Sequence, residues 1–453
     1  MSAEKIAIIG LGYVGLPLAI ELAKAGYAVV GFEINPTRIT QLCTGQDVTA
    51  EVAPTDLRTT TAQLTTAASA LATANIFIIT VPTPVDSKNQ PDLTPLQKAS
   101  ATVAQYLKKG DIVVYESTVY PGVTEDVCGP ILAAGSGLQV NIDFALGYSP
   151  ERVSPGDKIR TLRTIKKIVA ASTPAALERL AQMYGRVVDA GLHLAPTIKV
   201  AEAAKVIENI QRDVNIGLMN ELAVVFARLG ICTQDVLAAA GTKWNFLPFT
   251  PGLVGGHCIG VDPYYLSTRA EEVGVYPELI AAARRRNNAM AAFVAKQVVM
   301  ALGQQGQSGQ TVRGNTARVG ILGVTFKENT PDLRNTKVPD VVDELAAFGI
   351  AALVADPLAD GTEYTHEYPG KNLVDATQLQ DLDVLILAVP HREILTDIPA
   401  LWARVKPGGM LVDLKGALRA TTAPEQAEKL HGTALTALAK AYPIPEGKRY
   451  WSL

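Results

Sequence analysis

Short apolar runs alternate with helical stretches through the first 195 residues of the chain. The runs have the length of buried strands, and this alternation predicts a mostly parallel sheet with helices on both faces. The first predicted helix is Leu16–Ala25. The predicted strands are Ile6–Ile9, Ala28–Phe32, Ile76–Val81, Ile112–Glu116, Ala145–Gly147 and Lys167–Ala170.

The middle of the chain has a different pattern. Residues 197–229 read as one long helix, with Gly217 as the only glycine and without proline, and Gly230 ends it. A stretch rich in glycine and proline follows over 241–260, and helical sequence returns near 277–302. The polar, glycine-rich segment 303–315 is typical of a linker.

After this segment the chain starts a second α/β half, so we predict the order α/β, helical middle, α/β. The corresponding division is 1–196, 197–302, a linker over 303–315, and 316–453. The second half has a predicted helix at Val338–Phe348 and predicted strands at Arg318–Leu322, Ala351–Ala355, Val384–Val389 and Met410–Asp413.

The composition is that of an ordinary globular protein, with 48% hydrophobic residues and a net charge of −3. A nucleic-acid or anionic-membrane partner would favour a basic surface, so we expect neither. The chain enters its first apolar run without the pattern of a targeting segment, and no run approaches the roughly 20 apolar residues that span a bilayer. The four cysteines are scattered without metal-ligand spacing, so we expect no metal site and a reduced, cytoplasmic protein.

The glycine-rich turn 10–15 (GLGYVG) follows the first predicted strand and opens the first predicted helix. Its glycines permit a tight turn and a close approach of the backbone to a pyrophosphate, which the helix N-terminus can bind. Glu33 ends the second predicted strand, where its carboxylate can bind ribose hydroxyls and repel a 2′-phosphate, so NAD is favoured over NADP. Arg38 either accepts such a phosphate or is a solvated helix charge.

Cys258 lies in the glycine-rich segment 252–263 (GLVGGHCIGVDP). Glycines let a substrate approach closely, so this setting favours a functional thiol over a buried cysteine in a structural turn. Asp262 lies four residues further on, near enough to act at the same centre. His257 is either the base of the thiol or a structural or phosphate-binding residue, and successive side chains usually point apart. The remaining cysteines are assigned to packing: Cys43, Cys128 and Cys232.

A thiol combined with NAD indicates an oxidation that ends in an acid. A simple alcohol oxidation needs no thiol, whereas a thiolate can add to an aldehyde and give a thiohemiacetal that loses a hydride. The resulting thioester is then hydrolysed. We therefore expect Cys258 to be a covalent nucleophile.

Four polar residues recur at helical spacing within 197–229 and would share one face of that helix: Lys205, Asn209, Arg212 and Asp213. The face is either a solvated stripe or a wall of the active site, where a lysine could position a water or stabilise an alkoxide. Lys327 is a second candidate because it follows the first strand of the second α/β half, where such sheets bind ligands. The alternative there is an ordinary polar loop.

Several motifs, in order and over essentially the whole chain, resemble the UDP-glucose/GDP-mannose dehydrogenase family. They are Gly10–Pro17 (GLGYVGLP), Glu116–Val119 (ESTV), Ser149–Arg152 (SPER), Ala201–Asn209 (AEAAKVIEN), Gly255–Asp262 (GGHCIGVD) and Gly323–Thr336 (GVTFKENTPDLRNT). Within the family, the segments 211–222 and 243–252 and the GGHC form resemble the branch acting on UDP-N-acetylhexosamines. That branch contains UDP-N-acetylglucosamine and UDP-N-acetylgalactosamine 6-dehydrogenases, which supply hexosaminuronic acids for bacterial surface polysaccharide.

The resemblance implies two Rossmann-like doubly wound domains joined by a long central helix, which forms a homodimer interface. By this resemblance, 1–196 binds NAD, 197–302 is the dimerisation domain with the cysteine loop, and 316–453 binds the UDP-sugar. The implied reaction oxidises the C6 alcohol of the sugar twice, with two NAD and one water, without release of the aldehyde.

The resemblance also implies a role for each matching residue. Cys258 would be the nucleophile, Lys205 and Asp262 would hold a water and stabilise the alkoxide and the thiohemiacetal oxyanion, and Asn209 would join that oxyanion site. Glu151 with Thr118 would assist thioester hydrolysis. The implied substrate contacts are Glu151, Lys205, Asn209, Lys243, Phe249, Gly255, Gly256, Phe326 and Lys327. The implied NAD contacts are Gly10, Gly12, Tyr13, Val14, Gly15, Glu33, Arg38, Thr83, Thr118 and Arg334.

The chain departs from the family pattern in three places. Glu33 stands where many members have Asp, Pro82 stands where some relatives of the UDP-glucose type have Asn or Gly, and the segment 152–160 differs from that type. The sequence does not reveal the C2 and C4 configuration of the sugar, so UDP-glucose and UDP-N-acetylmannosamine are alternative substrates. A two-electron dehydrogenase of the 3-hydroxyacid type and a non-catalytic NAD-binding protein are further alternatives, and neither has a use for Cys258.

Overall fold

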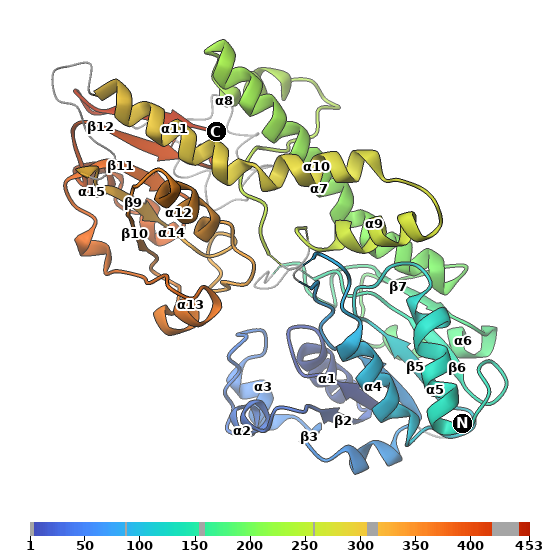
Figure 1. Ribbon diagram of the computed structural model, residues 1–453. Coiled ribbons are helices and arrows are strands. Elements are labelled where there is room, and N and C mark those ends of the chain that lie inside the picture. Colours follow the sequence, from blue (N-terminus) through green and yellow to red (C-terminus); the bar gives the residue numbers. More distant parts are fainter. Residues whose placement is uncertain (1–3, 87, 154–158, 257–258, 306–315, 419–443) are drawn as a thin grey trace. The chain divides into compact units, whose positions relative to one another are not determined.

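The computed structural model describes residues 4–86, 88–153, 159–256, 259–305, 316–418 and 444–453. The chain divides into two compact units, which Figure 1 shows in sequence colours. The first unit comprises Met1–Asn209 and Val261–Tyr276, and the second comprises Ile210–Gly260 and Pro277–Leu453. None of the helices in the described ranges has the length and apolar character needed to cross a membrane.

The first unit is built on an eight-stranded sheet with the order β3-β2-β1-β4-β5-β6-β7-β8. Every neighbouring pair is parallel except β6 and β7, so the sheet matches the predicted doubly wound class. The strands are β1 (Lys5–Ile9), β2 (Ala28–Phe32), β3 (Gln63–Thr65), β4 (Ile76–Ile79), β5 (Ile112–Tyr115), β6 (Ala145–Tyr148), β7 (Lys167–Ala171) and β8 (Leu192–Leu194).

Helices cover both faces of this sheet because each buries an apolar stripe against it. One core cluster joins one face to α4, α5 and the start of α7, and a second cluster joins the other face to α1, α2, α3 and α6. The helices of the unit are α1 (Gly15–Lys24), α2 (Pro36–Cys43), α3 (Pro54–Thr59), the 3-10 helix η1 (Ala68–Thr73), α4 (Thr94–Ala104), the π-helix η2 (Val123–Cys128), α5 (Gly129–Ser136), α6 (Pro174–Tyr184) and α9 (Asp262–Glu272).

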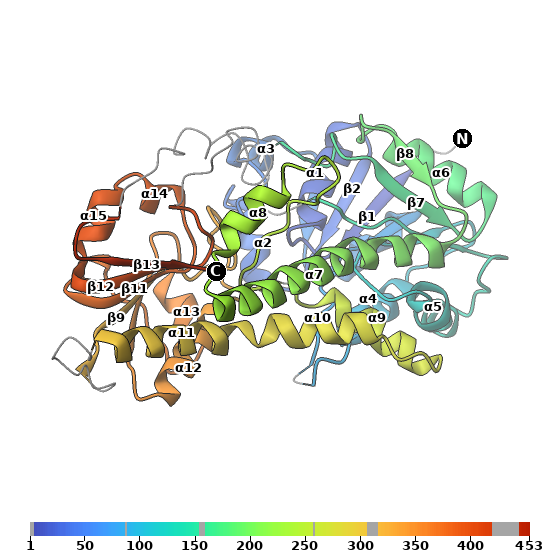
Figure 2. The same cartoon turned by 90° about the horizontal axis from the view of Figure 1, so that it is seen from above.

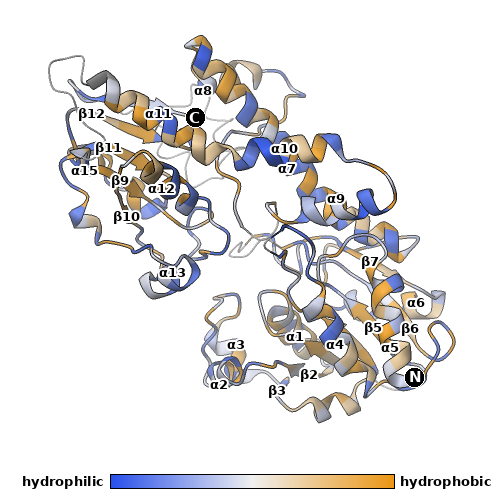
Figure 3. Cartoon of the chain, in the orientation of Figure 1, coloured by the Kyte–Doolittle hydropathy of each residue, from blue (hydrophilic) through white to orange (hydrophobic). Residues whose placement is uncertain are grey.

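The second unit contains a five-stranded, fully parallel sheet with the order β10-β9-β11-β12-β13. Its strands are β9 (Val319–Leu322), β10 (Ala352–Ala355), β11 (Leu382–Leu387), β12 (Val405–Asp413) and β13 (Arg449–Ser452). Figure 3 colours β9 and β11 mainly as hydrophobic. The helices are α8 (Thr233–Ala240), α10 (Glu278–Asn288), α11 (Met290–Gln305), α12 (Val338–Ala347), α13 (Gly361–Glu367), the 3-10 helix η5 (Ala376–Gln378), α14 (Arg392–Leu395) and α15 (Ile398–Ala403).

The long helix predicted from the sequence is α7 (Ile198–Leu229), which Figure 2 shows along its length. It belongs to the first unit through Asn209 and to the second from Ile210. The helical stretch predicted near 277–302 is two helices, α10 and α11, and α11 continues to Gln305. Residues 306–315 of the predicted linker lie outside the described residues. The sequence did not predict β3, β8 and β13, which all lie at or next to sheet edges and contain few buried residues.

Candidate active site

The glycine-rich turn joins β1 to α1. Gly10 has a φ of +96°, and a Cβ on Gly15 would lie 1.9 Å from the carbonyl oxygen of Gly10, so both positions require glycine. A Cβ on Gly12 would meet no atom of the described residues within 4 Å, so the backbone there borders open space. The turn therefore leaves room for a pyrophosphate at the N-terminus of α1.

Glu33 is anchored beside this turn. Its Oε2 accepts from the amide of Leu11 at 3.0 Å, and its Oε1 accepts from the amide of Asn35 at 3.0 Å. Each oxygen keeps a further lone pair with which it can accept a ribose hydroxyl. The turn and this carboxylate together fit a bound dinucleotide. The other predicted NAD contacts of the first unit are half-buried: Tyr13, Val14, Thr83 and Thr118.

Arg38 is not a solvated helix charge, because its exposed fraction is only 8%. Its Nε and Nη2 donate to the carbonyl oxygen of Leu11 at 3.2 and 3.1 Å, and Nη2 also pairs with Asp47 at 2.8 Å. Nη1 is buried and has no hydrogen-bond partner among the described residues. Arg38 thus stabilises the glycine-rich turn through the Leu11 carbonyl oxygen, and its Nη1 remains able to donate a hydrogen bond.

The structure brings Lys205, Asn209 and Asp262 together within the first unit. Asn209 Nδ2 donates to Asp262 Oδ2 at 2.6 Å, and all three side chains are buried. Burial raises the pKa of Asp262 to about 6, although the Lys205 ammonium and the Asn209 amide act in the opposite direction. A buried ammonium, amide and carboxylate can hold a water and stabilise a developing oxyanion.

The polar face of α7 is buried, so the interpretation as a solvated stripe is wrong. Lys205, Asn209 and Asp213 are at most 8% exposed, whereas Arg212 lies at the margin of the face and is exposed. Sequence reasoning missed two buried members of this face, Glu202 and Asn220. Glu202 accepts from the amides of Gly122 and Thr124, and Asn220 forms hydrogen bonds with the amide and the carbonyl of Gly252. The helical spacing of Glu202 and Asn220 from Lys205 and Asn209 could have indicated in the sequence that they share this face.

Glu151 lies just after β6, next to a buried ion pair that the sequence did not reveal. Its Oε1 accepts from the amides of Arg152 and Val153, each at 2.6 Å. Its Oε2 lies 3.8 Å from Lys167 Nζ, which also pairs with Glu116 at 3.0 Å. The sequence could have indicated this Lys167–Glu116 pair, because Glu116 directly follows the apolar strand β5 and Lys167 is the first residue of the apolar strand β7.

In the second unit, the predicted substrate residues Gly255, Gly256 and Phe326 lie together. Gly256 exchanges hydrogen bonds with Asn335: its amide donates to the Asn335 carbonyl oxygen at 3.1 Å, and Asn335 Nδ2 donates to its carbonyl oxygen at 2.9 Å. A Cβ on Gly256 would lie 2.8 Å from the Phe326 ring. The glycines are therefore required by close packing. Cys258 and His257 lie outside the described residues.

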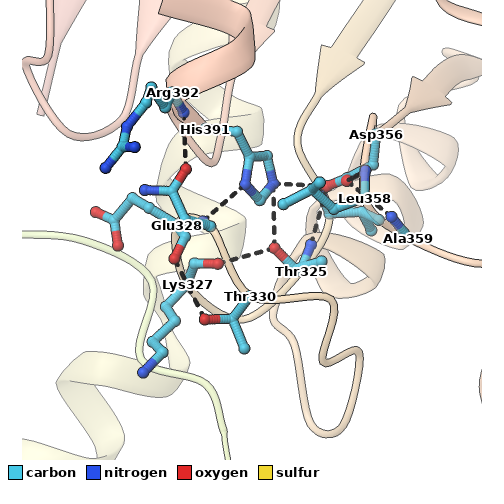
Figure 4. A network of polar contacts seen from close by, with 11 residues as sticks. Thr325, Lys327, Glu328, Thr330, Asp356, Leu358, Ala359, His391 and Arg392 are labelled. Atoms are coloured by element: carbon cyan, nitrogen blue, oxygen red, sulfur yellow. Dashed lines mark hydrogen bonds and ion pairs between the residues drawn. The ribbon is translucent and has the colours of Figure 1, made fainter. Parts of the chain in front are cut away.

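The loop that carries Lys327 is anchored by hydrogen bonds to His391 (Figure 4). The amide of Asn329 donates to His391 Nδ1 at 2.9 Å, so the ring proton is on Nε2, which lies 3.0 Å from Asp356 Oδ2. Thr325 Oγ1 donates to the Lys327 carbonyl oxygen at 2.9 Å. The Lys327 side chain points away from this network, so its ammonium lies outside the hydrogen-bonded interior of the loop.

Three further predicted site residues lie in the second unit: Lys243, Phe249 and Arg334. Lys243 is exposed and Phe249 is half-buried within an exposed loop. Arg334 belongs to the second unit and makes a two-point ion pair with Asp332. The prediction that Cys43 serves packing is wrong because it is exposed at the end of α2, whereas Cys128 is buried as predicted and Cys232 is half-buried.

Comparisons with known proteins identify the family of the chain. Models of the UDP-glucose/GDP-mannose dehydrogenase family match its NAD binding domain at residues 4–188, its central domain at 199–289 and its UDP binding domain at 320–420. A UDP-N-acetyl-D-glucosamine 6-dehydrogenase from Pseudomonas aeruginosa is 53% identical over 394 residues, which cover 87% of this chain and 92% of that protein. Protein CapL from Staphylococcus aureus is 51% identical over 413 residues, covering 91% of this chain and 96% of that protein.

A solved structure has the same fold over nearly the full length. It is a UDP-D-ManNAc dehydrogenase from Pyrococcus horikoshii, which superposes with a TM-score of 0.82 at 27% identity and covers 98% of each chain. The matched NAD binding domain coincides with the sheet that carries the glycine-rich turn and Glu33. The chain is therefore an NAD-dependent dehydrogenase that belongs to the UDP-glucose/GDP-mannose dehydrogenase family.

Proposed function

We propose that the protein oxidises the C6 hydroxyl of a UDP-N-acetylhexosamine, UDP-N-acetylglucosamine or UDP-N-acetylgalactosamine, to the carboxylate. The overall reaction consumes two NAD and one water and releases two NADH. The observation that carries the proposal is the buried cluster of Lys205, Asn209 and Asp262, with its Asn209–Asp262 hydrogen bond of 2.6 Å. The relative from Pseudomonas aeruginosa named for the same oxidation supports the sugar class.

The first oxidation uses this cluster. Lys205 and Asp262 hold a water that takes the proton of the C6 hydroxyl, while the ammonium of Lys205 and the amide of Asn209 stabilise the oxygen as its negative charge develops. NAD, when bound, accepts the hydride that leaves C6. The product at this stage is an aldehyde that stays bound.

The second oxidation passes through a covalent intermediate on Cys258. The thiolate adds to the aldehyde, and in this proposal the Lys205 ammonium and the Asn209 amide stabilise the thiohemiacetal oxygen. The second hydride, which a second NAD would accept, then leaves the same carbon, and the intermediate becomes a thioester. Glu151, together with Thr118, then directs water to the thioester carbonyl, which frees the thiol and the carboxylate.

The second unit recognises the nucleotide sugar. Lys327 supplies a positive charge for the diphosphate. The close packing of Gly256 on Phe326 and of Gly255 on the backbone at Asn335 shapes a wall for the sugar. The exposed loop with Lys243 and Phe249 supplies further contacts. The product, a UDP-hexosaminuronate, is suited to the synthesis of surface polysaccharide.

Counting NADH tests the proposal. Purified protein is offered a limiting amount of UDP-N-acetylglucosamine, and we expect two NADH for each sugar consumed, with no free aldehyde. One NADH per sugar with released aldehyde would show a two-electron enzyme instead. Cys258→Ser is expected to abolish steady-state turnover to the acid, and an undiminished rate would exclude the covalent step.

A substrate panel separates the nucleotide sugars. We expect the kcat/KM for UDP-N-acetylglucosamine and UDP-N-acetylgalactosamine to exceed that for UDP-glucose and UDP-N-acetylmannosamine. A higher kcat/KM for either of the last two would transfer the proposal to that sugar. The two preferred sugars differ only at C4, so their ratio measures how the site reads that position.

We also propose a homodimer formed through α7. The face of α7 opposite its buried polar residues is apolar and exposed: Val200, Ile207, Leu218, Val225 and Leu229 are 44–63% exposed. At 100° per residue these five positions lie within a narrow stripe, and an apolar stripe of this kind on a helix is typical of an interface. Ile207→Glu combined with Leu218→Glu is expected to give monomers by light scattering. A dimer that persists in this variant would place the interface elsewhere.

A further inference from the structure

A buried ion pair lies directly behind Glu151 in the first unit. Lys167 Nζ is 3.0 Å from Glu116 Oε2, and Tyr184 donates its hydroxyl to Glu116 Oε1 at 2.5 Å. The side chains of Lys167 and Glu116 are only 4% and 0% exposed. Burying an ion pair costs desolvation energy, so a pair at this position needs a reason beyond stability.

Glu151 has more contact with solvent than the other side chains of this cluster, at 16% exposure. Two backbone amides, those of Arg152 and Val153, hold one of its oxygens, and the other oxygen faces Lys167 Nζ at 3.8 Å. Lys167 also donates to the carbonyl oxygen of Pro150 at 3.3 Å, so it is anchored to the residue before Glu151. The orientation of the Glu151 carboxylate is thus set by contacts on both oxygens.

The charges of the cluster do not balance. Two carboxylates, Glu116 and Glu151, share the single ammonium of Lys167, and burial raises the pKa of Glu116, an effect that Lys167 opposes and Glu151 reinforces. The other charged groups at hand are Arg152 and Glu208, which pair with each other at 2.8 Å. Lys167, paired with Glu116, is therefore the cation that faces the Glu151 carboxylate.

We propose that Lys167 and Glu116 are positioning residues that orient Glu151 and set its charge for thioester hydrolysis. This inference rests on the proposed role of Glu151 in that step. The two residues act with opposite sign. Without the Glu116 charge, Lys167 attracts Glu151 alone and favours its ionised form; without the Lys167 charge, two carboxylates repel each other and favour protonation.

The experiment compares Lys167→Gln, Glu116→Gln and the double variant with a matched control, Lys166→Gln, which changes the neighbouring exposed lysine. Stopped-flow absorbance measures the NADH burst, and mass spectrometry of quenched samples follows the decay of the covalent adduct, which reports on thioester hydrolysis alone, from about pH 5 to about pH 9. In the Lys167→Gln variant, the acidic midpoint of the hydrolysis rate is expected to rise by about one pH unit or more; in the Glu116→Gln variant it is expected to fall. Lys166→Gln should match the wild type.

Two further readouts separate positioning from folding. The double variant removes both charges at once, and we expect a midpoint between those of the single variants and a melting temperature near that of the wild type. Lys167→Arg keeps the charge and is expected to restore the wild-type midpoint. Equal midpoints in both single variants, or shifts of the same sign, would overturn the proposal.

Glu151→Gln distinguishes this inference from the proposed function. We expect this variant to keep the NADH burst and to accumulate a covalent sugar adduct, seen by intact-protein mass spectrometry. No adduct and no loss of rate would refute the role of Glu151 itself. An adduct in Glu151→Gln, together with wild-type profiles for the Lys167 and Glu116 variants, would refute only the positioning role.

Discussion

The two sheets carry a carboxylate at the same topological place, but the partners of these carboxylates differ. Glu33 follows β2 and Asp356 follows β10, and each of these strands pairs in parallel with the first strand of its sheet, β1 or β9. Each Glu33 oxygen accepts one backbone amide. Asp356 accepts from His391 and from the backbone amides of four residues: Val324, Thr325, Leu358 and Ala359. These contacts leave its carboxylate no lone pair for a ribose hydroxyl.

The helix that follows the first strand differs as well. In the first unit α1 begins at Gly15, within the glycine-rich turn, so its N-terminus faces open space beside Gly12. In the second unit α12 begins only at Val338, after a loop that carries Lys327 and packs against Gly256. The same sheet topology thus has an open glycine-rich turn for a dinucleotide in the first unit and a long loop with Lys327 in the second unit. In the second unit, groups of the chain itself occupy the carboxylate that corresponds to Glu33.

The largest effect is expected from Gly15→Ala. Its Cβ would lie 1.9 Å from the carbonyl oxygen of Gly10, so the turn must open, at a cost of about 3 kcal/mol. We expect a loss of NAD affinity of about 100-fold or more, measured by calorimetry. Gly12→Ala is the matched control: its Cβ meets no atom of the described residues, so the melting temperature should be unchanged while NAD binding weakens. Unchanged NAD affinity in both variants would show that the cofactor binds elsewhere.

His391→Ala tests the filled site of the second unit. The change leaves Asp356 and the Asn329 amide without their buried partner, which should destabilise this unit by about 3 kcal/mol. We expect the KM for the UDP-sugar to rise about 10-fold through disorder of the Lys327 loop, while NAD affinity stays the same. His366→Ala removes an exposed histidine of the same unit and serves as the control. A change in NAD affinity with an unchanged KM for the sugar would contradict the division of roles.

Glu33→Ala and Asp356→Ala form a pair that compares the two carboxylates directly. Loss of Glu33 removes a ribose acceptor and the repulsion of a 2′-phosphate, so the preference for NAD over NADP should fall about 10-fold, equal to about 1.4 kcal/mol. Asp356→Ala should lower stability without a change in cofactor preference. The ratio of kcat/KM for the two cofactors measures this, and NADP used as well as NAD by the wild type would refute the role of Glu33.

The fold was largely predictable because strand and helix formation left clear local patterns. The apolar runs at β1, β2 and β4 were found with errors of at most two residues, and α7 was found from its uninterrupted helical spacing. The short strands β3 and β8 have only three residues each, which gives no pattern to recognise.

The site was only partly predictable because its support depends on long-range contacts. Lys205 and Asn209 share a helical face, which spacing reveals, but the pairing of Lys167 with Glu116 joins residues that are 51 positions apart. His391 stands alone in its loop and gives no local signal of its bond to Asn329. The role of Arg38 was ambiguous because its partner Asp47 lies in a loop and belongs to no recognisable motif. Such contacts form between residues that the tertiary structure brings together, so the local pattern of a single sequence does not predict them.

The smallest effect in the comparison concerns pH. Burial raises the pKa of Asp262 to about 6, whereas hydrogen bonds from His391 and backbone amides outweigh burial at Asp356 and lower its pKa. In the proposed mechanism Asp262 holds the water in its ionised form, so activity should fall as the pH drops through about 6. Asp356 has a folded-state pKa below its ordinary value of 3.8, so the stability that it contributes is complete above that value and is lost only as the pH falls through the lowered one.

At about pH 5, below the raised pKa of Asp262 and above the lowered pKa of Asp356, the activity should therefore fall to roughly a tenth while the second unit remains folded. The three tryptophans, Trp244, Trp402 and Trp451, all lie in that unit, so their fluorescence reports on it alone. Activity should return on adjustment to neutral pH. Asn209→Ala removes the hydrogen bond that lowers the pKa of Asp262, so the midpoint of the acidic limb should rise, by about one pH unit or less. A fluorescence change that coincides with the loss of activity would mean that acid unfolds the second unit first, and the contrast between the two carboxylates would fail.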